Sequence, residues 1–111
     1  MTYSVELTEQ AESDLRSIFE YIAFELGSVP HATGQLNRLQ KSIKGLNQMP
    51  ERFKVYDREP WRSRNLRIMP VDNYIVFYIP NKSSKKVNII RIMYSGRDEQ
   101  SQLDRFTAKT D

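Results

Sequence analysis

The 111-residue chain is long enough for one domain with a single modest core. It has no cysteine and one histidine, which excludes disulfides and makes a zinc site improbable, and it shows no membrane span or signal peptide. We therefore expect a soluble, cytoplasmic protein with no metal ion and no other cofactor. Its net charge of +3 is uneven: residues 1–50 hold four Lys/Arg against six Asp/Glu, and residues 51–111 hold thirteen against eight.

The first fifty residues predict one strand and two helices. Residues 3–7 alternate between apolar and polar side chains, as a half-buried strand does. Thr8 is a good N-cap for a helix whose apolar residues recur every three or four positions until Gly27. Pro30 suits the first turn of a second amphipathic helix, which ends at Met49-Pro50. With so few residues between them, the helices should form an antiparallel hairpin.

The second half changes to short runs rich in Val, Ile, Tyr and Phe, which are typical of strands. Turn-forming segments at 70–73 and 80–85 separate the later runs and indicate an antiparallel meander. The predicted strands are Phe53–Tyr56, Leu66–Met69, Tyr74–Ile79 and Val87–Met93.

These elements predict an α+β fold: an N-terminal strand, then a helical hairpin packed on a three- to four-stranded antiparallel sheet. The hairpin should cover one face of the sheet and leave the other partly free. We expect a single domain over residues 1–106, followed by a polar tail over residues 107–111.

Two arginines interrupt predicted strands. In a regular strand Ile90 and Ile92 share one face and Arg91 points to the other. Arg91 should then lie on the face away from the helices, where it meets a ligand or pairs with a neighbouring carboxylate. Arg67 is flanked by Leu66 and Ile68 in the same way.

Other basic and aromatic residues form candidate contact sites. Arg97 follows Gly96 just after the last predicted strand, and together with Tyr94 it could hold a phosphate and stack a base. Trp61 either anchors a loop to the core or is exposed to a partner. The basic run from 52 to 67 suits a polyanion, an acidic protein or a solvated surface; its members are Arg52, Lys54, Arg58, Arg62, Arg64 and Arg67.

Nothing in the sequence provides conventional catalytic machinery. There is no Ser/His/Asp or Cys/His set, no persuasive carboxylate pair and no Gly-rich phosphate loop. The segments "VELTEQAESDLRSIFEYI", "IKGLNQMPERF", "RNLRIMPVDNYIVFYI" and "VNIIRIMYSGRD" nevertheless occur in an order that resembles the RelE/ParE superfamily of bacterial type II toxins. The similarity runs from Tyr3 to about Gln100.

The resemblance implies the same strand, hairpin and sheet, and it also implies a partner. Such toxins are held inactive by a small antitoxin whose acidic or amphipathic segment wraps the toxin, and the basic second half would suit it. Function divides within the superfamily. RelE-like members cut messenger RNA in the ribosomal A site, and ParE-like members poison DNA gyrase.

The resemblance fits the nuclease branch only in part. Arg97 falls on the Arg that follows the last strand of the RelE pattern, and Arg67 falls near its strand Lys if one residue is gapped. Ile75 stands where that pattern has a strand Arg, however, and Leu103 stands at the position of the C-terminal catalytic Tyr. The segment "NYIVFY" is closer to the ParE side.

We therefore expect a toxin that is neutralised by a cognate antitoxin and that inhibits gyrase. The alternatives are a ribosome-dependent endoribonuclease and a decayed relative that only binds a partner. In the nuclease case the catalytic residues would be Arg67, Arg97 and Tyr94. The expected partner or target contacts are Arg62, Arg64, Arg67, Arg91 and Arg97.

Overall fold

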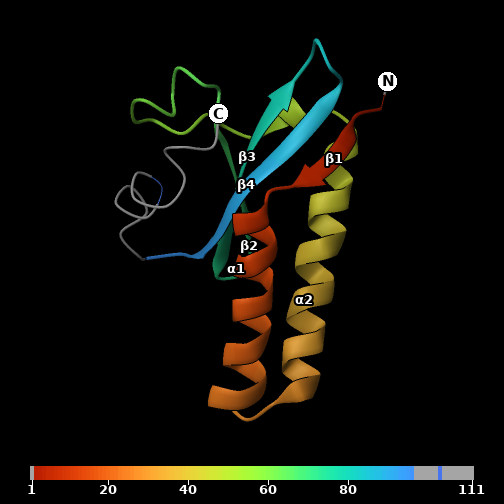
Figure 1. Ribbon diagram of the computed structural model, residues 1–111, viewed down its shortest axis with the longest axis vertical. Coiled ribbons are helices and arrows are strands. Elements are labelled where there is room, and N and C mark those ends of the chain that lie inside the picture. Colours follow the sequence, from red (N-terminus) through yellow and green to blue (C-terminus); the bar gives the residue numbers. More distant parts are fainter. Residues whose placement is uncertain (1, 97–102, 104–111) are drawn as a thin grey trace.

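The computed structural model describes residues 2–96 together with residue 103 (Figure 1). Among these residues, no helix is both long and apolar enough to cross a bilayer. The helices and strands follow one another as β1 (Ser4–Leu7), α1 (Glu9–Glu20), the π-helical segment η1 (Tyr21–Glu25), α2 (Val29–Lys44), the 3₁₀ turns η2 (Gly45–Asn47) and η3 (Pro50–Arg52), β2 (Arg67–Val71), β3 (Tyr74–Asn81) and β4 (Lys86–Tyr94).

The four strands form one sheet in the order β1-β4-β3-β2. β2, β3 and β4 make the predicted antiparallel meander, whereas β1 pairs with β4 in parallel, so the sheet is mixed. The α+β prediction is confirmed, with β1 as the parallel addition. The predicted strand Phe53–Tyr56 is wrong, because only one isolated bridge, between Val55 and Arg67, forms there.

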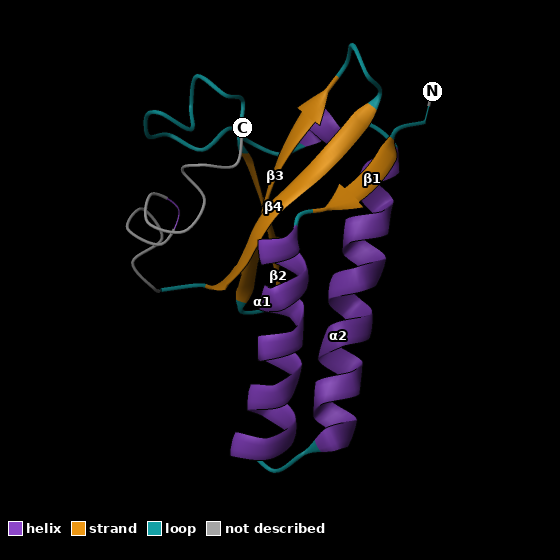
Figure 2. Cartoon of the chain, viewed as in Figure 1, coloured by secondary structure: helices purple, strands orange, loops and turns teal. Residues whose placement is uncertain are grey.

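The helical hairpin packs on one face of the sheet and projects beyond its end (Figure 2). Thr8 caps α1 as expected, since its hydroxyl accepts a hydrogen bond from the Ala11 N–H at 3.1 Å. Ser28 caps α2 in the same way, and Gly27 turns the chain between the helices with φ of +72°. The main core lies between helices and sheet and includes Ala11, Leu15, Leu39, Ile43, Leu46, Val76, Tyr78, Val87, Ile89 and Ile92.

The second face of the sheet, which we expected to be partly free, carries a smaller core of its own, at whose margin Ile68, Ile75 and Ile79 stay partly exposed. The segment between η3 and β2 folds over this face and buries Trp61 almost completely. Leu103 is fully buried in the same cluster. This second core consists of Tyr56, Trp61, Leu66, Phe77, Ile90, Met93 and Leu103.

An irregularity in β4 decides which of its side chains face the helices. Phe77 pairs with Arg91 but Tyr78 pairs with Ile89, so Ile90 is an extra residue without a register partner on β3. Strict alternation is therefore wrong for this strand. Ile89 and Ile92 pack on the helix side, whereas Ile90 belongs to the second core.

Candidate functional site

Arg91 is bound to the first helix and does not project into solvent. Its Nε and Nη2 donate to the two carboxylate oxygens of Asp14 on α1 at 2.7 Å and 3.0 Å. The two side chains are only 11% and 15% exposed. Of the two alternatives left by the sequence, pairing with a carboxylate is correct, but the pair is nearly buried and lies against the helix.

The same carboxylate also caps the edge of β4. β1 ends at Leu7, and beyond it Thr8 donates its backbone N–H to Ile89 O and its hydroxyl to Ile90 O. The next edge donor, the Ile92 N–H, is bound by Asp14 Oδ2 at 2.8 Å. Arg91 and Asp14 therefore hold α1 against the edge of β4 at the point where β1 no longer pairs with it.

Arg67 also has a structural role. Its Nη1 donates to the carbonyl oxygens of Glu51 and Phe53 at 2.8 Å and 2.7 Å, which ties β2 to the chain around η3. Tyr78, its register partner on β3, donates its hydroxyl hydrogen to Pro50 O at 2.6 Å. Burial raises the pKa of Tyr78 to about 12.

The remaining predicted cations differ in their surroundings. Arg64 lies over the ring of the buried Trp61, with its guanidinium carbon 5.0 Å from the ring centroid, whereas Arg62 is exposed. Trp61 is thus a loop anchor and not an exposed contact. Arg97 lies outside the described residues.

The predicted nuclease residues do not meet within the described part of the chain. Arg67 pairs with Tyr78 and Tyr94 pairs with Tyr74, so the two positions lie four steps apart along β3, about 13 Å of strand. Leu103, which the RelE resemblance placed at the position of a catalytic Tyr, is fully buried. No group of His, Cys, Asp or Glu suited to a metal ion occurs in the region that the structure describes.

A groove of about 1030 Å³ opens where the hairpin diverges from the ends of β3 and β4. One wall comes from α1 and η1, another from α2, and the floor from the end of β4. Tyr21 and Leu26 on the hairpin and Tyr94 on β4 line it and are 54%, 61% and 51% exposed. Such a group of exposed apolar side chains marks an interaction surface. The groove also contains Asp14, Ile18, Ile22, His31, Gln35, Arg38, Tyr74, Arg91, Ile92 and Met93.

Polar contacts hold the groove together at α2. Arg38 Nε and Gln35 Nε2 donate to Asp72 Oδ2 at 2.8 Å and 2.9 Å, which joins α2 to the turn between β2 and β3. The hydrogen bonds from Arg38 and Gln35 lower the pKa of Asp72. Burial, with smaller contributions from Tyr94 and Tyr21, raises the pKa of Tyr74.

Sequence reasoning selected Arg91 and Tyr94, which both line the groove, but it did not predict the groove itself. Half of the lining residues are apolar or aromatic, and these come from the hairpin and from β3 and β4. Tyr21 and Phe24 do not belong to the buried stripe of the first helix, and this was the available signal: large aromatics on the outer face of a helix.

The fold is shared by several solved toxin–antitoxin structures. The chain is 18% identical to a chain of the chromosomal ParDE system from P. aeruginosa, with a TM-score of 0.68 and coverage of 85% of this chain and 97% of that one. For the complex RelBE2 from Mycobacterium tuberculosis the identity is 21%, the TM-score 0.65 and the coverage 85% and 92%. For the archaeal RelE-RelB complex from Pyrococcus horikoshii these values are 24%, 0.60, 87% and 99%. At such identities the likeness shows the fold alone.

The sequence itself gives the family. No curated protein matches it. Residues 5–99 match the family described as ParE toxin of type II toxin-antitoxin system, parDE. This match covers most of the 111 residues, so the chain belongs to the ParE toxin family of type II toxin–antitoxin systems.

Proposed function

We propose that this toxin acts in the cytoplasm as a ParE-like inhibitor of DNA gyrase and that a cognate antitoxin keeps it inactive. The family match over residues 5–99 supports the ParE-like mechanism, and the burial of Leu103 is the observation that argues against the RelE-like one. In the RelE-like pattern this position supplies a catalytic Tyr that must reach the scissile phosphate. Here the side chain has no proton to transfer and packs in the second core.

The described cations support the same assignment. A nuclease without a conventional base depends on several cations that stabilise one phosphate together. Arg91 is occupied by Asp14, and Arg67 is occupied by two backbone carbonyls. A RelE-like active site would need both side chains to leave these contacts. Inhibition by binding makes no such demand.

The groove is the proposed docking site for the antitoxin. Its rim presents Tyr21, Leu26 and Tyr94, and an amphipathic segment with two or three apolar anchors would cover all three. Two of the similar structures are described as toxin–antitoxin or RelE-RelB complexes, which supports a protein partner for this chain too.

The decisive experiment compares two activities of the same purified chain. Gyrase supercoiling of a relaxed plasmid is measured with increasing toxin, and ribosome-bound messenger RNA is probed by primer extension. We expect loss of supercoiling without A-site cuts, and DNA damage when the chain is expressed alone.

Either of two results would contradict the proposal. A-site cuts with intact supercoiling would assign the chain to the endoribonucleases, which its structural likeness to RelE complexes keeps as the second candidate. Normal growth on expression without antitoxin, with no effect in either assay, would identify a decayed relative that only binds a partner. Antitoxin added back to the supercoiling reaction is the control, because it should restore activity.

A further inference from the structure

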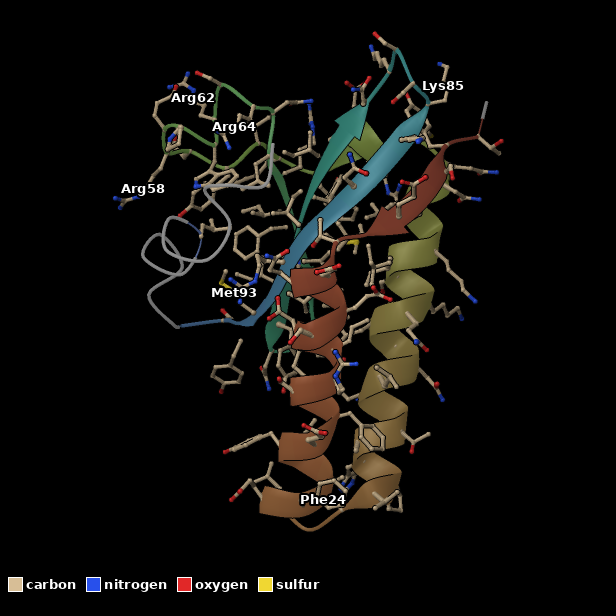
Figure 3. The ribbon with its side chains drawn as sticks, viewed as in Figure 1. Phe24, Arg58, Arg62, Arg64, Lys85 and Met93 are labelled. Atoms are coloured by element: carbon tan, nitrogen blue, oxygen red, sulfur yellow. The ribbon has the colours of Figure 1, made fainter. Side chains whose placement is uncertain are left out.

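The two ends of the molecule differ in charge. The far end of the hairpin, residues 17–37, contains Glu20 and Glu25 and no Lys or Arg. The opposite end carries the segment 54–64 and the turn between β3 and β4. Figure 3 shows this separation, with Phe24 at one extremity and Arg58, Arg62 and Lys85 at the other. The cations at that end are Lys54, Arg58, Arg62, Arg64, Lys82, Lys85 and Lys86.

Several of these cations are already engaged. Lys82 pairs with Glu51 at 3.3 Å, and Lys86 pairs with Glu6 at 3.5 Å. Arg64 lies over Trp61, and Lys85 lies over the ring of Tyr3.

Three further cations at this end are exposed. Hydrogen bonds from Ser63 lower the pKa of Glu59, and the charge of one of these cations, Arg62, adds to their effect. Lys54, Arg58 and Arg62 make no ion pair with any residue that the structure describes. The acidic residues of the same loop are Asp57, which is exposed, and Glu59, whose Oε1 accepts the Ser63 N–H at 3.1 Å.

The loop holds Arg58 and Arg62 in a fixed arrangement. The Arg62 N–H donates to Arg58 O at 2.9 Å, so a tight turn closes the backbone between the two residues. Trp61, between them in sequence, is 1% exposed and fixes the loop to the second core. The bond from the Tyr56 N–H to Leu66 O at 2.7 Å closes the base of the loop. Because the backbone of the loop is already ordered, anion binding by the two guanidinium groups costs side-chain entropy but no ordering of the loop.

The surroundings select the kind of anion. Guanidinium groups bind phosphate bidentately. Recognition of single-stranded RNA also uses aromatic side chains on which bases stack. At this end Trp61 and Tyr56 are buried, and the exposed aromatics of the described chain, Tyr21, Phe24 and Tyr94, lie on the hairpin and beside the groove. The available contacts therefore suit a phosphate backbone and not unpaired bases.

We infer that Lys54, Arg58 and Arg62 form a phosphate-binding surface for duplex DNA, separate from the groove. This goes beyond the proposed function, because a toxin that inhibits gyrase through protein contacts alone has no need of a DNA surface. The contact is independent of base sequence, since backbone phosphates are the same along the duplex.

The test measures binding of the purified chain to a fluorescent 20-base-pair duplex by anisotropy over a range of salt concentrations. The variant is Arg58→Ala/Arg62→Ala. The matched control is Arg16→Ala/Lys41→Ala, which removes two exposed cations from the helices. Each lost phosphate contact lowers the slope of log K against log salt by about 0.9, so the slope of the loop variant should fall by about 2. The control should keep the parent slope.

Two outcomes would overturn the inference. Equal slopes for the loop and control variants would show that the loop does not bind DNA, and tighter binding of single-stranded RNA of the same length would assign the surface to RNA. Unfolding curves of both variants should overlay that of the parent, because the replaced side chains are exposed. Gyrase is absent from this assay, so failure here is distinct from failure of the proposed function.

Discussion

A buried ion pair and an exposed one of almost the same length allow the effect of burial to be measured in this toxin. The Arg91–Asp14 and Arg38–Asp72 contacts are 2.7 Å and 2.8 Å long. The side chains of the first pair are 11% and 15% exposed, and those of the second are 59% and 42% exposed. Removal of one partner from a buried pair leaves an uncompensated charge, whereas water compensates an exposed one.

We therefore expect Arg91→Met to lower the free energy of unfolding by about 3 kcal/mol and Arg38→Met by less than about 1 kcal/mol. Urea unfolding followed by circular dichroism measures both. Equal losses would mean that Asp14 is solvated well enough without Arg91. The double variant Asp14→Asn/Arg91→Met should recover part of the loss, since it leaves no buried charge.

The hydroxyl of Tyr78 gives the fold a dependence on alkaline pH. Its pKa rises from 10 to about 12 on folding, mainly through burial, so its contribution to stability is complete below pH 10 and is lost as the pH approaches 12. Tyr78→Phe should cost about 1 kcal/mol at pH 8, because Pro50 O loses its donor. The difference from the parent should shrink above pH 10. The free energy of unfolding of both proteins, measured between pH 8 and 11.5, tests this prediction. Tyr94→Phe, at an exposed position, is the control. A difference between parent and Tyr78→Phe that stays constant over this pH range would contradict the prediction.

At the scale of elements, the short β1 is the notable feature, because it leaves much of the edge of β4 uncovered. Thr8, which caps α1, and Asp14, in the second turn of α1, supply the next hydrogen bonds to that edge. The helix thus continues the protection that a longer strand would give. An unprotected edge would be free to pair with other chains.

Thr8 has two roles, as the cap of α1 and as a donor to Ile90 O. Thr8→Ala should therefore cost about 2 kcal/mol, more than Ser28→Ala, which removes only an exposed cap of α2 and should cost about 1 kcal/mol. Thr8→Ser retains both hydrogen bonds and should stay within about 0.5 kcal/mol of the parent. Thermal and urea unfolding of the three variants measure the ranking. If Thr8→Ala lowers the free energy of unfolding no more than Ser28→Ala does, the hydrogen bond from Thr8 to the edge of β4 contributes nothing to stability.

The elements also show what could be predicted from the sequence. The helices follow from local periodicity and caps, since Thr8 and Pro30 act within one turn of their own positions. The extra residue at Ile90 has no local signal, because a bulge is defined by the partner strand. The burial of Trp61 and Leu103 against the second face likewise depends on contacts between distant segments.

The candidate sites likewise depended on contacts between distant segments, which the sequence does not reveal. The sequence drew attention to Arg67 and Arg91, which fold-specific contacts then occupy. Isolated arginines in strands do not reveal whether a carboxylate or a carbonyl will meet them. Arg62 lies in a loop and is exposed, so it stays a predicted contact residue.

At the scale of the whole molecule, an elongated shape of 43 × 32 × 21 Å separates the surfaces. The groove lies between the hairpin and the ends of β3 and β4. Arg58 and Arg62 lie toward the end of the molecule opposite Phe24 (Figure 3). This separation would let an antitoxin and a nucleic acid contact different parts of the chain. If the antitoxin and the nucleic acid exclude each other, the cause would then be steric or electrostatic repulsion by the antitoxin and not a shared binding site.

Leu26→Glu tests the groove at this scale, with Met49→Glu as its matched control. Both side chains are exposed, by 61% and 75%, but only Leu26 lines the groove. We expect Leu26→Glu to weaken antitoxin binding by at least about tenfold, since a carboxylate would be buried against the partner, while Met49→Glu leaves it unchanged. Isothermal titration calorimetry measures both. Equal affinities would place the antitoxin elsewhere.

The parallel pairing of β1 with β4 also has a consequence for how the chain folds. Thr8 and Ile90, which meet at the end of β1, are 82 positions apart in the sequence. Contacts of such separation form late, because a long loop must close before they stabilise anything. During synthesis the first strand therefore stays without its neighbour until β4 has been made. The sheet of this toxin cannot be completed before β4 has left the ribosome.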